Sequence, residues 1–201
     1  MIRPQLMSSP NSVVFTSGDS ATVRAARSAS AADRAPRVAL IAHFDPASRL
    51  GPSLTGLAHA LADVGYLPVV VTTSPGPPDP GGLPPSTVVV ARPNRGYDFG
   101  SWAAGLRLLP TARRAAEVVL TNDSMVGPFA PLGDLMGRAA ASGADVWAAT
   151  SSLQVVPHLQ SYLLRFAPGV LARPELVGFF GGIRHLDNKV AIVRRYELGL
   201  T

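Results

Sequence analysis

The sequence lacks cysteine and long apolar runs. None of its 201 residues is cysteine, which excludes a disulfide framework, a Cys-ligated zinc site and a thiol nucleophile. No apolar run approaches the roughly 18 residues that a membrane-spanning helix needs, and the first residues contain no apolar segment typical of a secretion signal. We therefore expect a cytoplasmic protein with no transmembrane segment, with peripheral attachment at the inner face of the membrane as the alternative.

Lysine is scarce, and the positive charge is not clustered. The 18 Lys and Arg residues against 13 Asp and Glu give a net charge of +5, but Lys189 is the only lysine and the arginines are spread along the chain. No basic stripe alternates with aromatic residues, as the grooves that follow a nucleic-acid backbone require. The sequence therefore predicts no nucleic-acid partner.

The composition predicts one globular domain after a tail. Residues 1–36 are rich in Ser and Ala and show no sustained helical or strand period, so we predict that they are disordered. In the whole chain 47% of the residues are hydrophobic, which is enough for a sizeable core. Residues 37–201 are predicted to form that core.

Strand-like runs alternate with helical patterns from residue 37 onward. Apolar, β-branched runs predict strands at residues 37–44, 67–74, 86–92, 117–124 and 145–152. Apolar residues at helical spacing predict helices over residues 54–64, 99–109 and 132–140. This alternation predicts an α/β fold with a Rossmann-like, mostly parallel sheet and helices on both faces.

Turn and cap residues punctuate this pattern. Gly65 and Gly143 are placed to end the first and third helices, and Asp98 is placed as the N-cap of the second. Residues 75–86 are so rich in proline and glycine that they predict a loop. Trp102 and Trp147 follow the helix and strand spacing, which indicates core positions.

Polar clusters follow the predicted strands directly, at residues 43–45, 72–74, 94–98 and 122–124. The carboxyl ends of parallel strands meet at one edge of a sheet, and ligands bind there in open α/β folds. We therefore expect these clusters to converge on one binding site.

The cluster Asn94, Arg95, Gly96 and Asp98 leads into the second predicted helix. Backbone N–H groups at a helix N-terminus, with an arginine beside them, are suited to a pyrophosphate. The alternative is a capped helix start with turn glycines, in which Asp98 occupies the same N–H groups.

Asn122, Asp123 and Ser124 end the fourth predicted strand. A carboxylate at such a position can hold Mg²⁺ or Mn²⁺ that is shared with a diphosphate, although Asn and Asp after a strand are also common turn formers. A third reading combines His43 and Asp45, two residues apart, with Asp123 in a metal-dependent hydrolase. Further along, His158 and Gln160 are available for a sugar hydroxyl, unless His158 is a core histidine with satisfied hydrogen bonds.

Several blocks in this order resemble a known family: RVALIAHFDP, RPNRGYDFGSWAAGL, VVLTNDSMVGPFAPL, DVWAATSS with HLQSYLLRF, and RRYELGLT. They resemble the rhamnan synthesis protein F family of bacterial polysaccharide assembly, from about Arg37 to Thr201. The family is similar to GT-A glycosyltransferases that build rhamnose-containing surface polysaccharides and lipopolysaccharide. The resemblance implies a nucleotide-sugar donor, with dTDP-rhamnose as the first candidate, and a glycan or lipid-linked acceptor.

The resemblance also implies roles for particular residues. Asn94, Arg95 and Gly96 match the turn that lies near the donor in GT-A enzymes. Asn122, Asp123 and Ser124 match the strand-end motif that binds metal and pyrophosphate, with Asp123 as the ligand of Mg²⁺ or Mn²⁺. Ser124 stands where the usual motif has a second acidic residue.

An inverting transfer needs a base for the acceptor hydroxyl, and Asp145 and His158 are the two candidates. The chain ends at Thr201, where we expect a late acceptor-site segment to be missing. A non-catalytic module that binds a sugar nucleotide or glycan is therefore the alternative function. A partner glycosyltransferase that completes the site is compatible with both.

Overall fold

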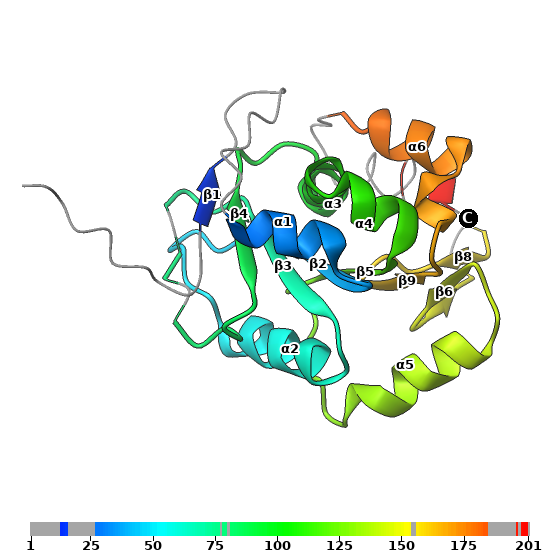
Figure 1. Ribbon diagram of the computed structural model, residues 1–201, viewed down its shortest axis with the longest axis horizontal. Coiled ribbons are helices and arrows are strands. Elements are labelled where there is room, and N and C mark those ends of the chain that lie inside the picture. Colours follow the sequence, from blue (N-terminus) through cyan, green and yellow to red (C-terminus); the bar gives the residue numbers. More distant parts are fainter. Residues whose placement is uncertain are drawn as a thin grey trace, which may run out of the picture.

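A central sheet organises the fold. The computed structural model describes residues 13–15, 27–76, 78–79, 81–153, 156–184, 196 and 198–200. Within them, seven strands form one sheet in the order β1-β4-β3-β2-β5-β9-β6, and β7 pairs with β8 beside it (Figure 1). The strands are β1 (Val13–Phe15), β2 (Arg37–His43), β3 (Leu67–Thr72), β4 (Val88–Ala91), β5 (Glu117–Asn122), β6 (Val146–Ala148), β7 (Ser151–Ser152), β8 (His158–Leu159) and β9 (Leu163–Phe166).

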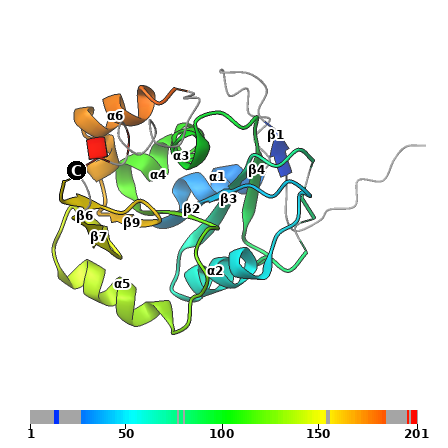
Figure 2. The ribbon, with the colours of Figure 1, turned by 180° about the vertical axis from the view of Figure 1, so that it is seen from behind.

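Helices cover both faces of this sheet, as Figures 1 and 2 show. One face carries α1, α3, α4 and α6, and the other carries α2 and α5. The helices are α1 (Arg27–Arg34), α2 (Pro52–Asp63), α3 (Tyr97–Leu108), α4 (Pro110–Ala115), α5 (Leu132–Ala141) and α6 (Pro174–Gly181), with 3-10 turns η1 (Val170–Ala172) and η3 (Leu198–Leu200). Alternate residues of β2 enter the two cores: Leu40 packs on the α3 side and Ile41 on the α2 side. The predicted α/β fold is confirmed.

The sequence signals for the first half of the sheet hold. β2, β3, β4 and β5 lie within the predicted strands and are parallel to their neighbours among these four. Gly65 follows α2 with a φ of +86°, a left-handed conformation that suits glycine at the end of a helix. Trp102 is fully buried and donates its indole N–H to the carbonyl oxygen of Thr121, 2.8 Å away.

The predicted strand at residues 145–152 is different in the structure. It divides into β6 and β7, and β9 lies between β5 and β6, antiparallel to both. No helix of the crossover kind separates β6 from β9 in the described residues, and strands joined without a crossover pair in antiparallel orientation. The sheet is therefore mixed at this edge.

The predicted disordered tail also contains structure. β1 pairs in parallel with β4, and α1 packs against α4. The Asp33 carboxylate accepts hydrogen bonds from the backbone N–H groups of Thr111 and Ala112, at 2.7 and 3.1 Å, in the first turn of α4. The sequence signal of α1 is weak because the residue that this helix places in the core, Ala32, has a small side chain. The predicted boundary at residue 37 thus omits two elements that pack on the domain.

Candidate functional site

The predicted polar clusters meet at the carboxyl ends of β2, β3, β4 and β5, which we call the rim. The Thr73 N–H donates to the His43 carbonyl oxygen at 3.0 Å, and the Asp123 N–H donates to that of Ala42 at 3.2 Å. The Arg92 N–H donates to the Thr72 carbonyl oxygen at 3.0 Å. These bonds extend the ladder beyond the strands, so the four segments leave the sheet side by side.

A cavity of about 360 Å³ opens at the rim beside the start of α3. We call it the rim cavity; it is lined by His43, Phe44, Thr73, Asn94, Tyr97, Asp98 and Ser101. His43, Asn94 and Asp98 belong to the predicted donor site. Phe44, Thr73 and Tyr97 belong to the predicted polar clusters but were given no role in donor binding, and Ser101 lies outside those clusters.

Phe44 and Tyr97 are the most informative of these four residues. They remain 50% and 44% exposed although both are large and apolar, and Tyr97 has a left-handed φ of +52°. The available signal was an aromatic residue directly after a buried strand, and another directly after a turn glycine. Exposed aromatic rings on a cavity offer flat surfaces on which a base or the apolar face of a sugar can pack.

His43 is buried and is held from two sides. Its Nε2 lies 3.1 Å from the carbonyl oxygen of Arg49, and its Nδ1 lies 2.9 Å from the hydroxyl oxygen of Thr72. A carbonyl oxygen only accepts, so Nε2 carries a proton and has no lone pair for a metal. His43 therefore positions the rim rather than ligating a metal, which removes the histidine from the hydrolase reading.

Asp45 is also committed to local structure. Its Oδ1 accepts hydrogen bonds from the backbone N–H groups of Ala47 and Arg49, at 2.8 and 3.2 Å. The bond from Arg49 is the main reason why the pKa of this carboxyl is lowered, against a smaller opposing effect of burial. β2 ends at His43, so Asp45 lies in a turn and does not share a strand face with His43.

Asp123 is the acidic residue that points along the rim toward β2. Its Oδ2 accepts a hydrogen bond from the Phe44 N–H at 3.3 Å and lies 3.8 Å from Nε2 of His43. Burial raises the pKa of Asp123 above its ordinary value, and Asp45 adds to the rise, while His43 and the N–H bond from Phe44 oppose it. The carboxylate is therefore held in an environment that favours a neighbouring positive charge.

Asn122 links the end of β5 to α3. Its side-chain amide donates to Oδ2 of Asp98 at 2.8 Å, and its side-chain oxygen accepts from the Ser124 N–H at 3.3 Å. The N-cap of α3 is Gly96, with a φ of +78°, and Asp98 lies in the first helical turn. The predicted N-cap role of Asp98 is therefore wrong, because a left-handed glycine ends the loop two residues earlier.

Arg95 turns away from the rim cavity and lines a second one. This arginine cavity, of about 320 Å³, is formed by Arg92, Arg95, Gly100, Ala103, Arg107, Ile183 and Arg184. Asn94 and Arg95, which the sequence placed in one anion site, thus line different cavities on the two sides of the α3 N-terminus.

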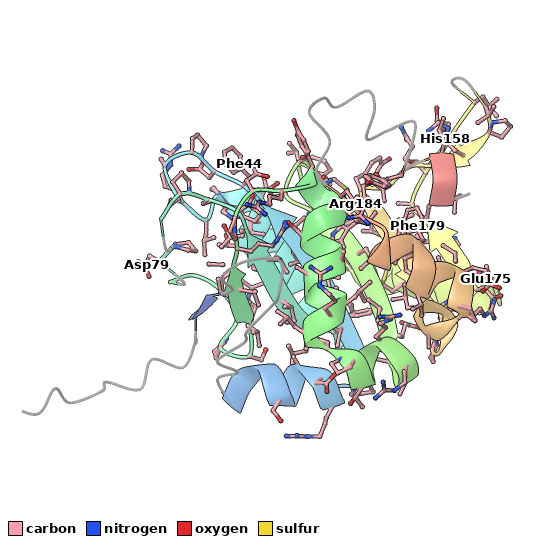
Figure 3. All side chains as sticks on the ribbon, turned by 90° about the horizontal axis from the view of Figure 1, so that it is seen from above. Phe44, Asp79, His158, Glu175, Phe179 and Arg184 are labelled. Carbon is pink, nitrogen blue, oxygen red and sulfur yellow. The ribbon has the colours of Figure 1, made fainter. Side chains whose placement is uncertain are left out.

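Gln160 lies on the rim side of the sheet, in the segment before β9, which pairs with β5. Its Oε1 accepts a hydrogen bond from the Thr150 hydroxyl at 2.6 Å, and the same hydroxyl contacts the Tyr162 hydroxyl. His158 lies nearby in β8, where its Nδ1 is 2.8 Å from the Val156 carbonyl oxygen. Figure 3 shows His158 and Phe44 along the same edge but well apart. Neither His158 nor Gln160 lines the rim cavity.

Asp145 lies at the opposite edge. It directly precedes β6, whose first residue is level with Phe166 and, through it, with Val118 near the start of β5. Its carboxylate is 2.6 Å from Nη1 of Arg173. The structure therefore does not bring Asp145 to the rim, and this separation overturns its candidacy as a base for chemistry there.

A divalent cation at the rim would need ligands beyond the side chains that the structure describes there. In the described part of the chain, no three His, Asp or Glu side chains gather as a metal-binding group. Asp45 is bound to backbone amides and Asp98 to Asn122, which leaves Asp123 as the carboxylate to offer. Mg²⁺ accepts one or two carboxylates together with substrate phosphates, so Asp123 fits a metal that arrives with a diphosphate.

A third cavity, of about 420 Å³, lies on the other face between α5 and the loop that follows β5. Its lining is mainly apolar, and Val126 and Phe129 beside it are 74% and 88% exposed. A charged sugar nucleotide does not match that surface, so the candidate site remains the smaller rim cavity.

The fold and the rim define an α/β domain with a polar cavity at the carboxyl ends of a mostly parallel sheet. A family model described as Rhamnan synthesis protein F matches residues 86–201. The chain belongs to the rhamnan synthesis protein F family. The match contains α3, Asn94 and Asp123, whereas residues 37–85, which the resemblance in the sequence also included, lie outside it.

Curated relatives match a part of the chain. The virulence protein VirA of Vibrio anguillarum is 33% identical over 118 residues, which are 56% of this chain and 37% of VirA. The uncharacterized protein y4gN of Sinorhizobium fredii is 29% identical over 119 residues, 57% of this chain and 31% of y4gN. The matched part thus spans about a third of each of these relatives. No solved structure matches the chain. Among the described helices, none combines the length and the apolar character needed to cross a bilayer.

Proposed function

We propose that this chain is a glycosyltransferase domain that moves rhamnose, or a related sugar, from a nucleotide-sugar donor to a growing cell-surface polysaccharide or lipid-linked glycan. The observation that carries this proposal is the rim cavity, in a chain of the rhamnan synthesis protein F family. It combines hydrogen-bonding groups for sugar hydroxyls, from Asn94, Asp98 and Ser101, with the exposed rings of Phe44 and Tyr97. This mixture is typical of sites for small polar ligands.

The donor diphosphate is placed at the Asp123 side of the rim. Mg²⁺ or Mn²⁺, held by Asp123 and the diphosphate, would neutralise the charge that develops on the leaving group. The Phe44 N–H orients the Asp123 carboxylate by donating to its Oδ2, and Nε2 of His43 lies 3.8 Å from the same oxygen. Asn122 fixes Asp98 at the entrance to the cavity.

His158 is the remaining candidate base. With Nδ1 donating its proton to the Val156 carbonyl oxygen, a neutral imidazole carries its lone pair on Nε2 and can accept a proton from an acceptor hydroxyl. This role requires the acceptor to reach from β8 to the rim cavity, and a His158→Gln variant tests it. We expect donor binding to persist in this variant while transfer is lost.

Donor binding is the first test. dTDP-rhamnose is added to the full chain with and without Mn²⁺, with UDP-glucose and GDP-mannose as controls. At an excess of about 100 times Kd, binding stabilises the folded state by roughly 2.7 kcal/mol, which raises Tm by roughly 5–10 °C for a chain of this length. Asp123→Asn should abolish the Mn²⁺-dependent part of the shift. Asp63→Asn, an exposed carboxylate at the end of α2, is the matched control. No shift with any donor would refute the proposal.

A non-catalytic module that binds a sugar nucleotide or glycan is the second candidate. Two observations favour it: Ser124 replaces a second acidic residue, and the described residues gather no three-residue metal site. Under this reading the donor binds at the rim but is neither transferred nor hydrolysed. Incubation with radiolabelled donor and a glycan acceptor separates the two functions, since only the transferase incorporates label. A partner glycosyltransferase, added to the same assay, tests whether a second protein completes the site.

A further inference from the structure

Four arginines line the arginine cavity beside α3. Arg92 and Arg95 belong to the loop that leaves β4, Arg107 to the last turn of α3, and Arg184 to the segment after α6. The chain has 18 basic residues in total, so more than a fifth of them line one cavity of about 320 Å³. No acidic residue is among the described residues that line it.

The cavity is built by a close contact that only glycine permits. A Cβ atom at Gly100 would lie 2.1 Å from the Arg95 carbonyl oxygen, which is far inside van der Waals contact. The missing side chain lets the loop lie directly on α3. The Arg92 guanidinium then donates to that carbonyl oxygen at 2.8 Å, and its other Nη lies 3.4 Å from the Ser101 hydroxyl. The loop is therefore fixed against the helix, and the cavity has a defined wall.

The two sides of the α3 N-terminus differ in charge. Asn94, Tyr97, Asp98 and Ser101 face the rim cavity, whereas Arg95 and Gly100 belong to the arginine cavity. In Figure 3, Phe44 and Arg184 accordingly lie on opposite sides of the upper end of α3. The rim side thus offers carboxylate and hydroxyl groups, and the other side offers guanidinium groups.

Arg107 shows that this charge is available to a ligand. It is exposed, and its guanidinium makes no hydrogen bond or ion pair with the part of the chain that the structure describes. The guanidinium groups of arginines that line a cavity attract anions. Their planar, forked N–H donors match phosphate oxygens in particular.

We propose that the arginine cavity is a binding site for a phosphate or diphosphate group, separate from the rim cavity and independent of metal. This inference does not depend on the proposed function. A phosphate group of this kind can belong to a nucleotide or to a lipid-linked molecule, and the two sources share the chemistry that the cavity recognises.

Calorimetric titration of the full chain with inorganic pyrophosphate, in buffer with EDTA, tests the proposal. We expect binding that weakens when NaCl rises from 50 to 200 mM, because exposed charges are screened. Arg107→Gln should weaken binding about tenfold, the loss of one charge-assisted hydrogen bond. The double variant Arg107→Gln, Arg184→Gln should weaken it further. Arg114→Gln, an exposed arginine on α4 away from the cavity, is the matched control and should change Kd less than twofold.

The outcomes separate this site from the rim. Pyrophosphate binding that is lost in Asp123→Asn but kept in Arg107→Gln would overturn the proposal, as would an absence of binding to the folded wild type. Circular dichroism confirms folding of each variant.

Two further ligands identify the source. If dTDP binds more tightly than pyrophosphate and depends on Arg107, the cavity serves a nucleotide. If a short-chain alkyl diphosphate does so instead, it serves a lipid-linked molecule. Either result supports the phosphate site, and a folded chain that binds dTDP-rhamnose independently of Arg107 leaves the proposed function intact.

Discussion

The two ends of the parallel strands hold buried polar side chains of similar kinds but arrange them differently. We call the end at which β2 and β5 begin the amino edge, and the rim the carboxyl edge. At the amino edge, Glu117 accepts a hydrogen bond from the Tyr66 hydroxyl and two from the Arg165 guanidinium, and Arg37 lies 3.7 Å from it. These groups satisfy one another. At the carboxyl edge, Asp123 is partly exposed and has a backbone N–H and a nearby histidine as neighbours, and these neighbours, Phe44 and His43, line the rim cavity. A closed network indicates a structural role, whereas a partly exposed carboxylate next to residues that line a cavity indicates a ligand.

The pKa shifts follow this difference. Burial alone would raise the pKa of Glu117, but the bonds from Tyr66 and Arg165 outweigh it and lower the value below the usual range. Burial of Tyr66 and its hydrogen bond to the Glu117 carboxylate raise the pKa of the Tyr66 hydroxyl. For Asp123 burial dominates and the pKa is raised. Loss of the charge is therefore expected to destabilise the folded state at Glu117 but not at Asp123.

The largest effect is expected from Glu117→Gln. This change leaves the buried guanidinium of Arg165 without its ion-pair partner, which costs about 3 kcal/mol of unfolding free energy, the lower end of the range for breaking a buried pair. Tm should fall by roughly 6–12 °C. Chemical and thermal denaturation measure both quantities. A loss below about 1 kcal/mol would show that the amino-edge network is no more than a weak surface pair.

Asn122→Asp should have the next largest effect. It replaces the amide donor that faces Asp98 by a second carboxylate, so that two acceptors meet across a 2.8 Å contact. We expect a loss of about 1–3 kcal/mol, as for a buried group left without its hydrogen bond. Asn122→Ser, which keeps a donor, is the comparison variant. Equal stability of the two variants would mean that the Asn122–Asp98 bond does not hold the rim together.

The acid side of the stability profile distinguishes the edges further. Because the folded-state pKa of Glu117 is lowered, its contribution is present above the ordinary value of 4.5 and is lost as the pH falls below it. The stability gap between wild type and Glu117→Gln should therefore be constant near neutral pH and narrow in acid. Urea denaturation at several pH values measures this gap. A gap that widens in acid would contradict the assignment.

The parallel half of the sheet could be predicted because its signals are local. The buried runs of β2, β3, β4 and β5 and the left-handed Gly65 follow directly from residue type and spacing. The antiparallel β9 could not be predicted, because pairing partners depend on the connection between strands. α1 was missed because alanine is the only apolar residue type in its sequence, so no large side chain marks the face that packs on the core.

The position of the site was predictable, but its division into the rim cavity and the arginine cavity was not. The strand-end rule brought His43, Asn94 and Asp123 to one edge, because it depends on strand direction alone. It could not show that Asn94 and Arg95 line different cavities, because a left-handed Gly96 and the contact at Gly100 decide which way each side chain turns. The same strand-end rule could have excluded Asp145, since a residue directly before a strand lies at its amino end.

The smallest stability change, and the sharpest contrast with Glu117→Gln, is expected from Asp123→Asn. An asparagine oxygen can still accept the bond from the Phe44 N–H, and the substitution removes a charge that burial disfavours. Unfolding free energy should therefore stay at the wild-type level or rise by up to about 1 kcal/mol, while Mn²⁺-dependent donor binding is lost. Parallel denaturation and donor titration of this variant measure both effects. A loss of stability as large as that of Glu117→Gln would show that Asp123 has a structural role. The polar groups at both edges would then stabilise the sheet, and the contrast between the two edges would not hold.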